Sequence, residues 1–375
     1  MRVLYEGSIF EMLRCGGVAR YFVELINRLP AQTTPIMLGP EEPASGITHP
    51  HFQYETVATR PPLKFLRKLW HPAQHGRINQ RMRAQQADLV HWTYYQGLCR
   101  RPIQRSAVPT VITVYDFIHE AFPDTDPTGK SLTMKARAID VADHICCISQ
   151  TTYDELCERF PAAADRASIT SLGSGLANVN AAPLPEELRG RPFVLFVGRR
   201  GGYKNFDLLW RAWNKMKQAT PDLNLVLVGP RMKPREQAAL GWSNEDPRTQ
   251  LYVAADDSLL KTLYQHCNAF VFPSKMEGFG LPVLEAMING CLVFASSCAA
   301  LREVAGSAGY FFDPENVDEL AELLIAAGNN TITDRDSKIA AGHCRADYFS
   351  WENTAAQTIK VYEDLLNRNC VRHAA

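Results

Sequence analysis

The chain has 375 residues, which is long for one hydrophobic core and suits two domains. Its 40 basic and 40 acidic residues balance, so no overall field selects nucleic acid or an acidic polymer as a partner. No apolar run approaches the ~18 residues of a membrane-spanning helix. The N-terminus enters a strand pattern at once and lacks the apolar core of a signal peptide, so we expect a cytoplasmic protein.

The ten cysteines are scattered along the chain and form no C-x-x-C pair. Cys146 and Cys147 are adjacent in an apolar run, where a strand would turn their side chains to opposite faces. We interpret all the cysteines as buried thiols of a reducing compartment, and we expect no metal site.

Short apolar, β-branched runs alternate with helical patterns in the first half of the chain. The predicted strands are 2–5, 35–38, 89–92, 110–114, 145–148 and 168–171, and the predicted helices are 18–29, 130–142 and 151–159. Alternation of this kind is typical of an α/β fold, in which crossover helices connect parallel strands.

The second half repeats the alternation. Its predicted strands are 193–197, 223–228, 250–253, 269–272, 292–295 and 310–312, and its helices are 206–218, 258–266, 281–288 and 317–327. Residues 173–190 interrupt the rhythm with Gly, Asn, Ala and Pro and are predicted as a linker. We therefore expect doubly wound, Rossmann-like domains at 1–172 and 191–350, with ligands in a central cleft beyond the carboxyl ends of the strands.

The most informative segment is 272–287, FPSKMEGFGLPVLEAM. It predicts a strand end, a glycine-containing turn and a helix whose first backbone N–H groups, near Gly278–Leu281, form an anion site. Gly278 and Gly280 have no side chains to keep a phosphate away. Glu277 precedes the helix and Glu285 lies a turn inside it, so one carboxylate can face a sugar and the other a ribose. A strand, turn and helix with two solvated glutamates is the plain alternative.

This segment resembles the E-x7-E motif of retaining glycosyltransferase family four, whose members have the GT-B fold. The resemblance covers nearly the whole chain, and the opening GGVARYF at 16–22 is similar to bacterial enzymes of surface polysaccharide assembly. It implies that Glu277 lies near the transferred sugar, that Glu285 holds the ribose, and that Gly278, Phe279, Gly280 and Leu281 border the donor. It also implies that 351–375 is a helix returning to the N-terminal, acceptor-side domain.

A second motif, VGRRGGYKN at 197–205, looks like the family's Gly-Arg…Lys-Asn signature. Two cations five residues apart can both reach a diphosphate and stabilise it as it leaves. We assign Arg199 and Lys204 to the phosphates, and Arg200 is a further cation that could replace Arg199. Surface cations near a turn are the alternative.

Three weaker assignments complete the donor side. Gly16 and Gly17 can present bare backbone N–H groups to the diphosphate, although a plain Gly-Gly turn fits as well. In relatives the base lies against backbone at 228–230 and 252–254, which gives Gly229 and Val253 to the site. Ordinary strand ends would carry the same residues.

The segment 113–123, TVYDFIHEAFP, follows a strand of the first domain. Many relatives carry Thr-x-His-Asp here, with the histidine on the sugar, but this chain has Tyr115 at that position. Asp116 and His119 are then candidates for sugar or acceptor binding, and a structural role for either is equally open.

Residues 60–83 hold seven Lys or Arg and no acidic residue, interleaved with Leu, Phe and Trp. This composition suits peripheral contact with the inner face of an anionic membrane. It also suits a pocket for an acceptor diphosphate, or a solvated basic face that packs its apolar side on the domain.

Other enzyme classes fit poorly. Gly129-Lys130-Ser131 imitates the end of a phosphate loop, but the required glycine is replaced by Asp124. No G-x-G-x-x-G follows an early strand, which weakens a dinucleotide-dependent dehydrogenase. Asp124-Thr125-Asp126 is a D-x-D triplet in a proline-flanked loop rather than at a strand end.

The expected reaction is transfer of a sugar, with retention, from a nucleotide diphosphate sugar to a saccharide or lipid-linked saccharide. The expected catalytic residues are Glu277, Arg199, Lys204, His119 and Asp116. A GDP-linked sugar such as mannose is favoured over UDP- and dTDP-sugars, and no cofactor or metal is expected. A GT-B phosphorylase and an inactive nucleotide-sugar-binding protein stay open.

Overall fold

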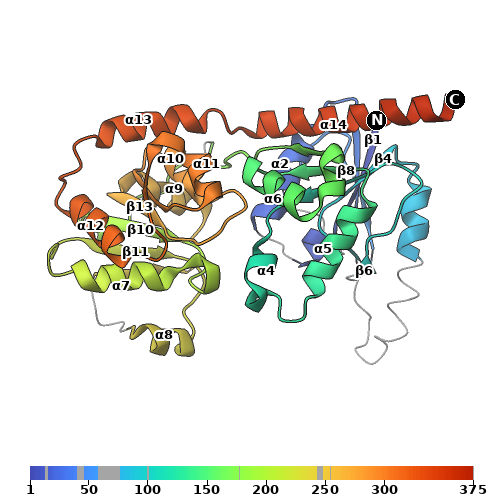
Figure 1. Cartoon of the computed structure of the whole chain (residues 1–375). Coiled ribbons are helices and arrows are strands. Elements are labelled where there is room, and N and C mark those ends of the chain that lie inside the picture. Colours follow the sequence, from blue (N-terminus) through green and yellow to red (C-terminus); the bar gives the residue numbers. More distant parts are fainter. Residues whose placement is uncertain are drawn as a thin grey trace. The chain divides into compact units, whose positions relative to one another are not determined.

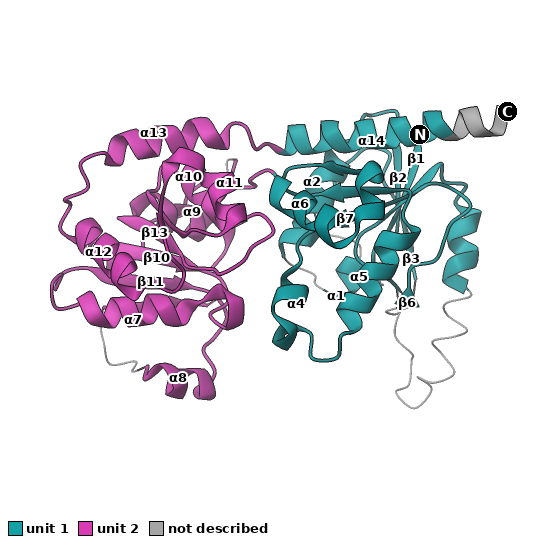
Figure 2. Cartoon of the chain, viewed as in Figure 1, with its two compact units in different colours: residues 1–172, 351–375 teal, residues 173–350 magenta. Residues whose placement is uncertain are grey.

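The structure, a computed structural model, describes residues 1–12, 16–39, 46–57, 77–98, 101–176, 178–242, 248–253 and 255–374, with side chains described as far as residue 368. The chain divides into two compact units (Figure 2): Met1–Leu172 with Trp351–Ala375 form unit 1, and Gly173–Ser350 form unit 2. Residues 173–190, expected as a linker, belong to unit 2, where Leu176 and Leu188 are buried.

Unit 1 is built on a seven-stranded parallel sheet in the order β3-β2-β1-β4-β7-β8-β9. The strands are β1 Arg2–Glu6, β2 Thr34–Gly39, β3 Gln53–Thr56, β4 Leu89–Trp92, β7 Thr110–Val114, β8 His144–Cys147 and β9 Ala167–Ile169. The central strands β4 and β7 are buried at every position, because helices cover both faces of a parallel sheet. A hairpin of β5 Gln96–Gly97 and β6 Arg101–Pro102 stands apart from the sheet.

The helices of unit 1 lie around this sheet (Figure 1). They are α1 Ser8–Met12, α2 Gly17–Asn27, α4 Ile118–Ala121, α5 Lys130–Val141, α6 Gln150–Arg159 and α14 Trp351–Ala374, with short 3₁₀ turns at Pro123–Thr125 and Pro161–Arg166. Residues 77–84 are also helical. Helix α2 buries Tyr21, Phe22, Leu25 and Ile26, which recur at helical spacing and face the core.

Helix α14 completes the core of unit 1 although it comes last in the chain. The hydroxyl of Tyr362 lies 2.6 Å from Nδ1 of His91 on β4 and 3.2 Å from the hydroxyl of Tyr5 on β1. All three side chains are fully buried, so their polar atoms depend on one another for hydrogen bonds.

Unit 2 has a six-stranded parallel sheet in the order β12-β11-β10-β13-β14-β15. The strands are β10 Phe193–Val197, β11 Asn224–Val228, β12 Thr249–Tyr252, β13 Ala269–Phe272, β14 Val293–Ser296 and β15 Gly309–Phe312. The order is that of the dinucleotide-binding folds, in which two halves add strands outwards from the centre.

The helices of unit 2 are α7 Phe206–Met216, α8 Pro234–Leu240, α9 Asp257–His266, α10 Leu281–Ile288, α11 Ala299–Ala305, α12 Val317–Gly328 and α13 Arg335–Ala346, with 3₁₀ turns at Glu186–Leu188, Gly202–Lys204 and Gly306–Ala308. Helix α7 buries Phe206, Leu209 and Trp213 against the sheet and α12. The predicted α/β fold with two Rossmann-like units is thus confirmed. In the described parts of the chain, no helix combines the length and apolar character that crossing a bilayer requires.

Each sheet has one point where the strand order reverses. It lies between β1 and β4 in unit 1 and between β10 and β13 in unit 2. Loops that leave the carboxyl ends of these strands diverge to opposite faces and leave room for a ligand. The predicted site residues follow these strands.

Candidate active site

The reversal point of unit 2 brings two distant motifs together. Lys204 follows β10 and Glu277 follows β13, and Nζ of Lys204 lies 2.7 Å from Oε1 of Glu277. The two side chains are only 18% and 10% exposed, so the pair is shielded from water while it still borders the surface. The amine also lies 5.1 Å from the ring centre of Phe272, which favours a cation at this place.

Gly280 sets the start of helix α10. Its φ of 105° is left-handed, and a Cβ there would lie 2.5 Å from Cδ2 of Leu301. Its carbonyl accepts hydrogen bonds from the N–H groups of Val283 and Leu284, at 2.9 and 3.3 Å, and these bonds form the first turn of the helix. Only glycine fits this position, and the turn directs the positive end of α10 toward the loop that carries Glu277.

The second glutamate of the motif has a partner that no sequence pattern indicated. Tyr264 of α9 donates its hydroxyl to Oε2 of Glu285 at 3.3 Å. Burial, and then the charge of Glu285, raises the pKa of Tyr264 well above its ordinary value, so the hydroxyl keeps its proton and serves as a donor. Tyr264 therefore orients the carboxylate that we assigned to the ribose.

Phe279 is buried and fixes the loop between the two glutamates. Its ring packs edge-to-face on Phe349 of the same unit, with ring centres 5.3 Å apart. A loop held in this way keeps its backbone N–H groups in place before a ligand arrives.

Asn205 connects three strand-end loops. Its φ is 54°, and its side-chain amide donates to the carbonyl of Pro273 at 3.1 Å and of Pro314 at 2.7 Å. These carbonyls follow β13 and β15, so Asn205 fixes the loop of Lys204 against the neighbouring loops. It stood in a motif of the sequence, but its role depends on contacts that the motif does not show.

The two adjacent arginines, Arg199 and Arg200, differ in burial and in their hydrogen-bond partners. Arg199 is exposed and has no ion pair or hydrogen bond with a described residue. The side chain of Arg200 is 1% exposed, and its Nε lies 2.7 Å from Oε1 of Glu236 while Nη2 donates to the carbonyl of Pro230 at 2.6 Å. Arg200 is thus committed to the segment after β11 and is not placed to replace Arg199 as we had suggested.

The residues assigned to the base lie at the ends of β11 and β12. Gly229 donates its N–H to the carbonyl of Tyr252 at 3.1 Å, and a Cβ on Gly229 would lie 2.3 Å from the carbonyl oxygen of Gly198. Val253 is 48% exposed, which is unusual for a large apolar side chain and leaves it available to a flat ligand. Ala254 lies outside the described residues.

In unit 1, Gly16 and Gly17 are exposed at the start of α2, and Cys15 lies outside the described residues.

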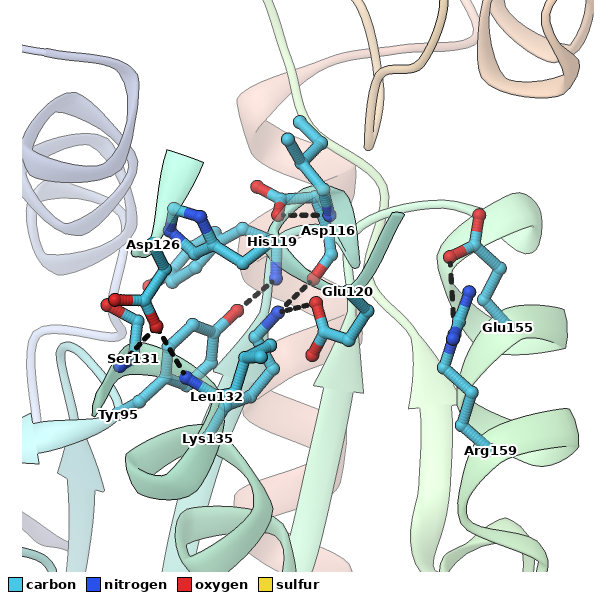
Figure 3. Close-up of polar contacts among 12 residues, drawn as sticks. Tyr95, Asp116, His119, Glu120, Asp126, Ser131, Leu132, Lys135, Glu155 and Arg159 are labelled. Atoms are coloured by element: carbon cyan, nitrogen blue, oxygen red, sulfur yellow. Dashed lines mark hydrogen bonds and ion pairs between the residues drawn. The ribbon is translucent and has the colours of Figure 1, made fainter. Parts of the chain in front are cut away.

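Asp116 connects the loop after β7 to helix α5. Its side-chain Oδ1 accepts the N–H of Ile118 at 3.0 Å, and its backbone carbonyl accepts a hydrogen bond from Nζ of the buried Lys135 at 2.8 Å (Figure 3). Lys135 also pairs with Glu120 at 2.9 Å, so this loop is tied to α5.

His119 is held by a neighbouring hydroxyl. Its Nδ1 lies 2.6 Å from Oγ1 of Thr125, whose hydrogen is donated to the carbonyl of Phe122. Nδ1 must then be the donor, which leaves Nε2 of the neutral ring as an acceptor. Tyr115, at the position of the family's histidine, is buried and donates its hydroxyl to the carbonyl of Thr93 at 3.0 Å, so its polar atom is used in the core.

Of the basic stretch 60–83, only residues 77–83 are described, as part of a helix, and 60–76 lie outside. Among the described residues, no three His, Cys, Asp or Glu side chains gather as metal ligands.

Two family models match the chain, one on each unit. Residues 15–173 match "Glycosyltransferase Family 4", and residues 185–342 match "Glycosyl transferases group 1". The O-antigen chain mannosyltransferase B of Escherichia coli is 30% identical over 278 residues, which are 68% of this chain and 70% of that protein. The serotype-specific mannosyltransferase WbdA of Escherichia coli is 30% identical over 256 residues, and the match spans only 31% of its length.

Solved structures agree at the level of the fold. Sucrose-phosphate synthase of Thermosynechococcus elongatus has a TM-score of 0.77 at 20% identity, over 98% of this chain and 99% of that one. Anabaena HepE in complex with UDP and glucose has a TM-score of 0.69 at 17% identity, over 96% of this chain and 99% of that one. Fold and matches together define a GT-B glycosyltransferase. The chain belongs to glycosyltransferase family 4.

Proposed function

We propose that this glycosyltransferase moves a hexose, with mannose the first candidate, from a nucleoside diphosphate sugar to a saccharide or lipid-linked saccharide. The new bond would lie on the same face of the sugar as the old one. The relatives named as mannosyltransferases, one of them for the O-antigen chain, support mannose and a role in surface polysaccharide assembly. We propose GDP as the nucleotide of the donor.

The observation that carries this proposal is the Lys204–Glu277 pair beside the start of α10. A diphosphate at this edge would meet a cation and a helix N-terminus, which both stabilise the negative charge that grows as the sugar–phosphate bond breaks. Glu277 would then exchange Lys204 for the sugar hydroxyls. Arg199 would supply a second cation from the same loop.

The chemistry needs no protein nucleophile. The bond from C1 of the sugar to the β-phosphate oxygen breaks, the acceptor oxygen attacks C1 from the same face, and the departing phosphate oxygen takes the acceptor proton. The chain's part is to hold both substrates and to stabilise charge. Glu285, oriented by Tyr264, would accept hydrogen bonds from the ribose diol.

Two other functions would use the same fold. A phosphorylase would use inorganic phosphate in place of the acceptor and a lysine-bound cofactor, and no motif of the sequence indicates such a lysine. A binding protein without activity would not need the shielded Lys204–Glu277 pair.

The test is a panel of GDP-, UDP- and dTDP-sugars in EDTA, scored by thermal stabilisation and then by transfer to a mannoside acceptor. A donor that binds the folded protein raises its stability by mass action, by about 2.7 kcal/mol at a hundred times its Kd. We expect GDP-mannose to stabilise most, and NMR of the product to show the donor's anomeric configuration. No stabilisation by any member, an absolute need for added metal, or an inverted product would each contradict the proposal.

A further inference from the structure

Two buried thiols meet where helices α9 and α10 end. Sγ of Cys267 lies 3.0 Å from Sγ of Cys291, and each residue is only 4% exposed. Neither is in a disulfide. The sulfurs of a disulfide are about 2.05 Å apart, so a shift of about 1 Å would bring this pair to bonding distance. The sequence carries no sign of the pair, because the two cysteines are 24 residues apart.

The end of each helix holds its cysteine in place. The N–H of Cys267 donates to the carbonyl of Leu263 at 3.1 Å, so Cys267 caps α9. Gly290 has a left-handed φ of 69°, which turns the chain after α10 and lets the N–H of Cys291 donate to the carbonyl of Ala286 at 3.0 Å. Neither helix therefore has to unwind for the two sulfurs to meet.

The surroundings of the pair favour a slow first oxidation and a fast second step. Burial raises the pKa of Cys267 well above its ordinary value, so little of the reactive thiolate is present at neutral pH. Hydrogen peroxide converts one thiol to a sulfenic acid and releases one water. The second thiol, 3.0 Å away, attacks the sulfenic sulfur, the S–S bond forms and a second water leaves. The two thiols thus lose two electrons and two protons to one peroxide.

A bond at this place would join two helices without entering the edge where we propose the donor site. Both cysteines come just before a strand, β13 or β14, and so lie at the amino ends of the sheet. Lys204 and Glu277 follow the carboxyl ends of their strands instead. The contact of Tyr264 with Glu285, at 3.3 Å, already connects α9 to α10, and Tyr264 lies one turn before Cys267. A disulfide would hold the two helices in the arrangement that this contact requires.

We propose that Cys267 and Cys291 are an oxidative modification site, at which peroxide closes a disulfide between the ends of α9 and α10. The bond restricts the opening of the two helices and leaves the protein able to bind nucleotide. It also keeps both sulfurs from irreversible oxidation, because the partner thiol consumes the sulfenic acid first. The site contains no residue assigned to the donor, so it stands independently of the proposed function.

The experiment treats the reduced full chain with hydrogen peroxide, blocks the remaining thiols and digests with trypsin. Peptides 262–275 and 276–302 should be found joined, with a mass two hydrogens below their sum. Peptide 276–302 also contains Cys298, so Cys298→Ser is the matched control and should keep the joined peptides. Cys291→Ser should abolish them and leave Cys267 to be oxidised to the sulfinic acid. Absence of the joined peptides in wild type, or their persistence in Cys291→Ser, would overturn the proposal.

Hydrogen exchange tests what the bond does to the folded protein. Amides of α9 and α10 should exchange about tenfold more slowly in the oxidised full chain, while those of α5 in unit 1 should not change. Equal exchange of α9 and α10 in both forms would show that the bond restricts nothing.

Thermal stabilisation by nucleoside diphosphate, measured on the same samples, should be alike in the reduced and oxidised forms. Its loss on oxidation alone would contradict the claim that the bond spares nucleotide binding. Its absence in both forms would refute the proposed function and leave the modification site in place.

Discussion

Lys204 and Glu277 are 73 residues apart in sequence and make one ion pair at the edge of unit 2 where we propose the donor site. Motif spacing pointed to each residue, because glycines and charges between a strand and a helix leave a local pattern. Their contact depends on β10 and β13 being neighbours, which only the topology decides. The contacts of Tyr264 and Asn205 could not be predicted for the same reason, since each side chain bonds to a residue or carbonyl of another segment, although Asn205 itself stood in a motif.

Lys204→Ala should weaken binding of nucleoside diphosphate and slow transfer together. One charge-assisted contact to the phosphates is lost, which costs about 1.5–3 kcal/mol. Calorimetric affinity and the transfer rate measure the two effects. Lys215→Ala is the control, because Lys215 forms an ion pair with Asp318 in which both side chains are more than half exposed. Equal affinity and rate in Lys204→Ala and the control would remove Lys204 from the site.

Glu6 provides a pH test of the interior of unit 1. Burial raises its pKa from 4.5 to about 8, against opposing hydrogen bonds from the N–H groups of Leu98 and Ser8. The folded state then keeps a proton that the unfolded state releases. This group's contribution to stability is therefore largest below pH 4.5 and declines up to pH 8, by at most ~1.4 kcal/mol per pH unit.

Glu6→Gln has no proton to lose at this position. Its free energy of unfolding, measured in urea, should rise relative to wild type between about pH 5 and 8 and then level off. A difference between the two proteins that is constant over this range would mean that Glu6 is already ionised in the folded state.

At the scale of elements, apolar runs predicted the buried strands well. Strands 89–92, 110–114, 193–197 and 269–272 have the bounds expected from sequence, because all or nearly all of their residues face the core. Strand β3, Gln53–Thr56, was missed: it is an edge strand without a fully buried residue, so its sequence carries no apolar run. The short helices α1, α8 and α11 were also missed, since five to seven residues hold less than two turns of periodicity.

Helix α10 depends on the backbone of Gly280. Gly280→Ala should destabilise unit 2 and weaken nucleotide binding, because the new methyl group would overlap Leu301 and the left-handed φ would be strained. Gly190→Ala measures the backbone strain alone, because Gly190 also has a left-handed φ, of 70°, but no atom lies within 4 Å of a new Cβ there. We expect ~1 kcal/mol for Gly190→Ala and clearly more for Gly280→Ala in urea unfolding. Equal losses would show that Leu301 does not restrict the turn.

At the scale of the whole molecule, one of the two hydrophobic cores is built from segments that lie far apart in the chain. Unit 2 is continuous, whereas unit 1 needs residues from both ends of the chain. A fragment of residues 173–350 should therefore unfold cooperatively on its own. A fragment of residues 1–172 should not, because it lacks α14 and exposes the polar atoms of His91 and Tyr5 that Tyr362 satisfies.

Joining residues 351–375 to 1–172 through a flexible linker should restore cooperative unfolding, as followed by near-ultraviolet circular dichroism. The same fusion with Tyr362→Ala should restore less of it. If residues 1–172 alone unfold with the stability of the fusion, α14 is not part of the unit 1 core.

The most direct test of the account compares Glu277→Ala with Glu285→Ala for affinity to free nucleoside diphosphate and for turnover of the donor. Glu285 lies inside α10 beside Tyr264, so its loss should mainly weaken nucleotide binding. Glu277 lies before the turn beside Lys204, so its loss should leave nucleotide affinity near wild type and depress turnover. The reverse pattern would exchange the two roles. If neither variant changed either quantity, the assignment of donor chemistry to this edge of unit 2 would be wrong.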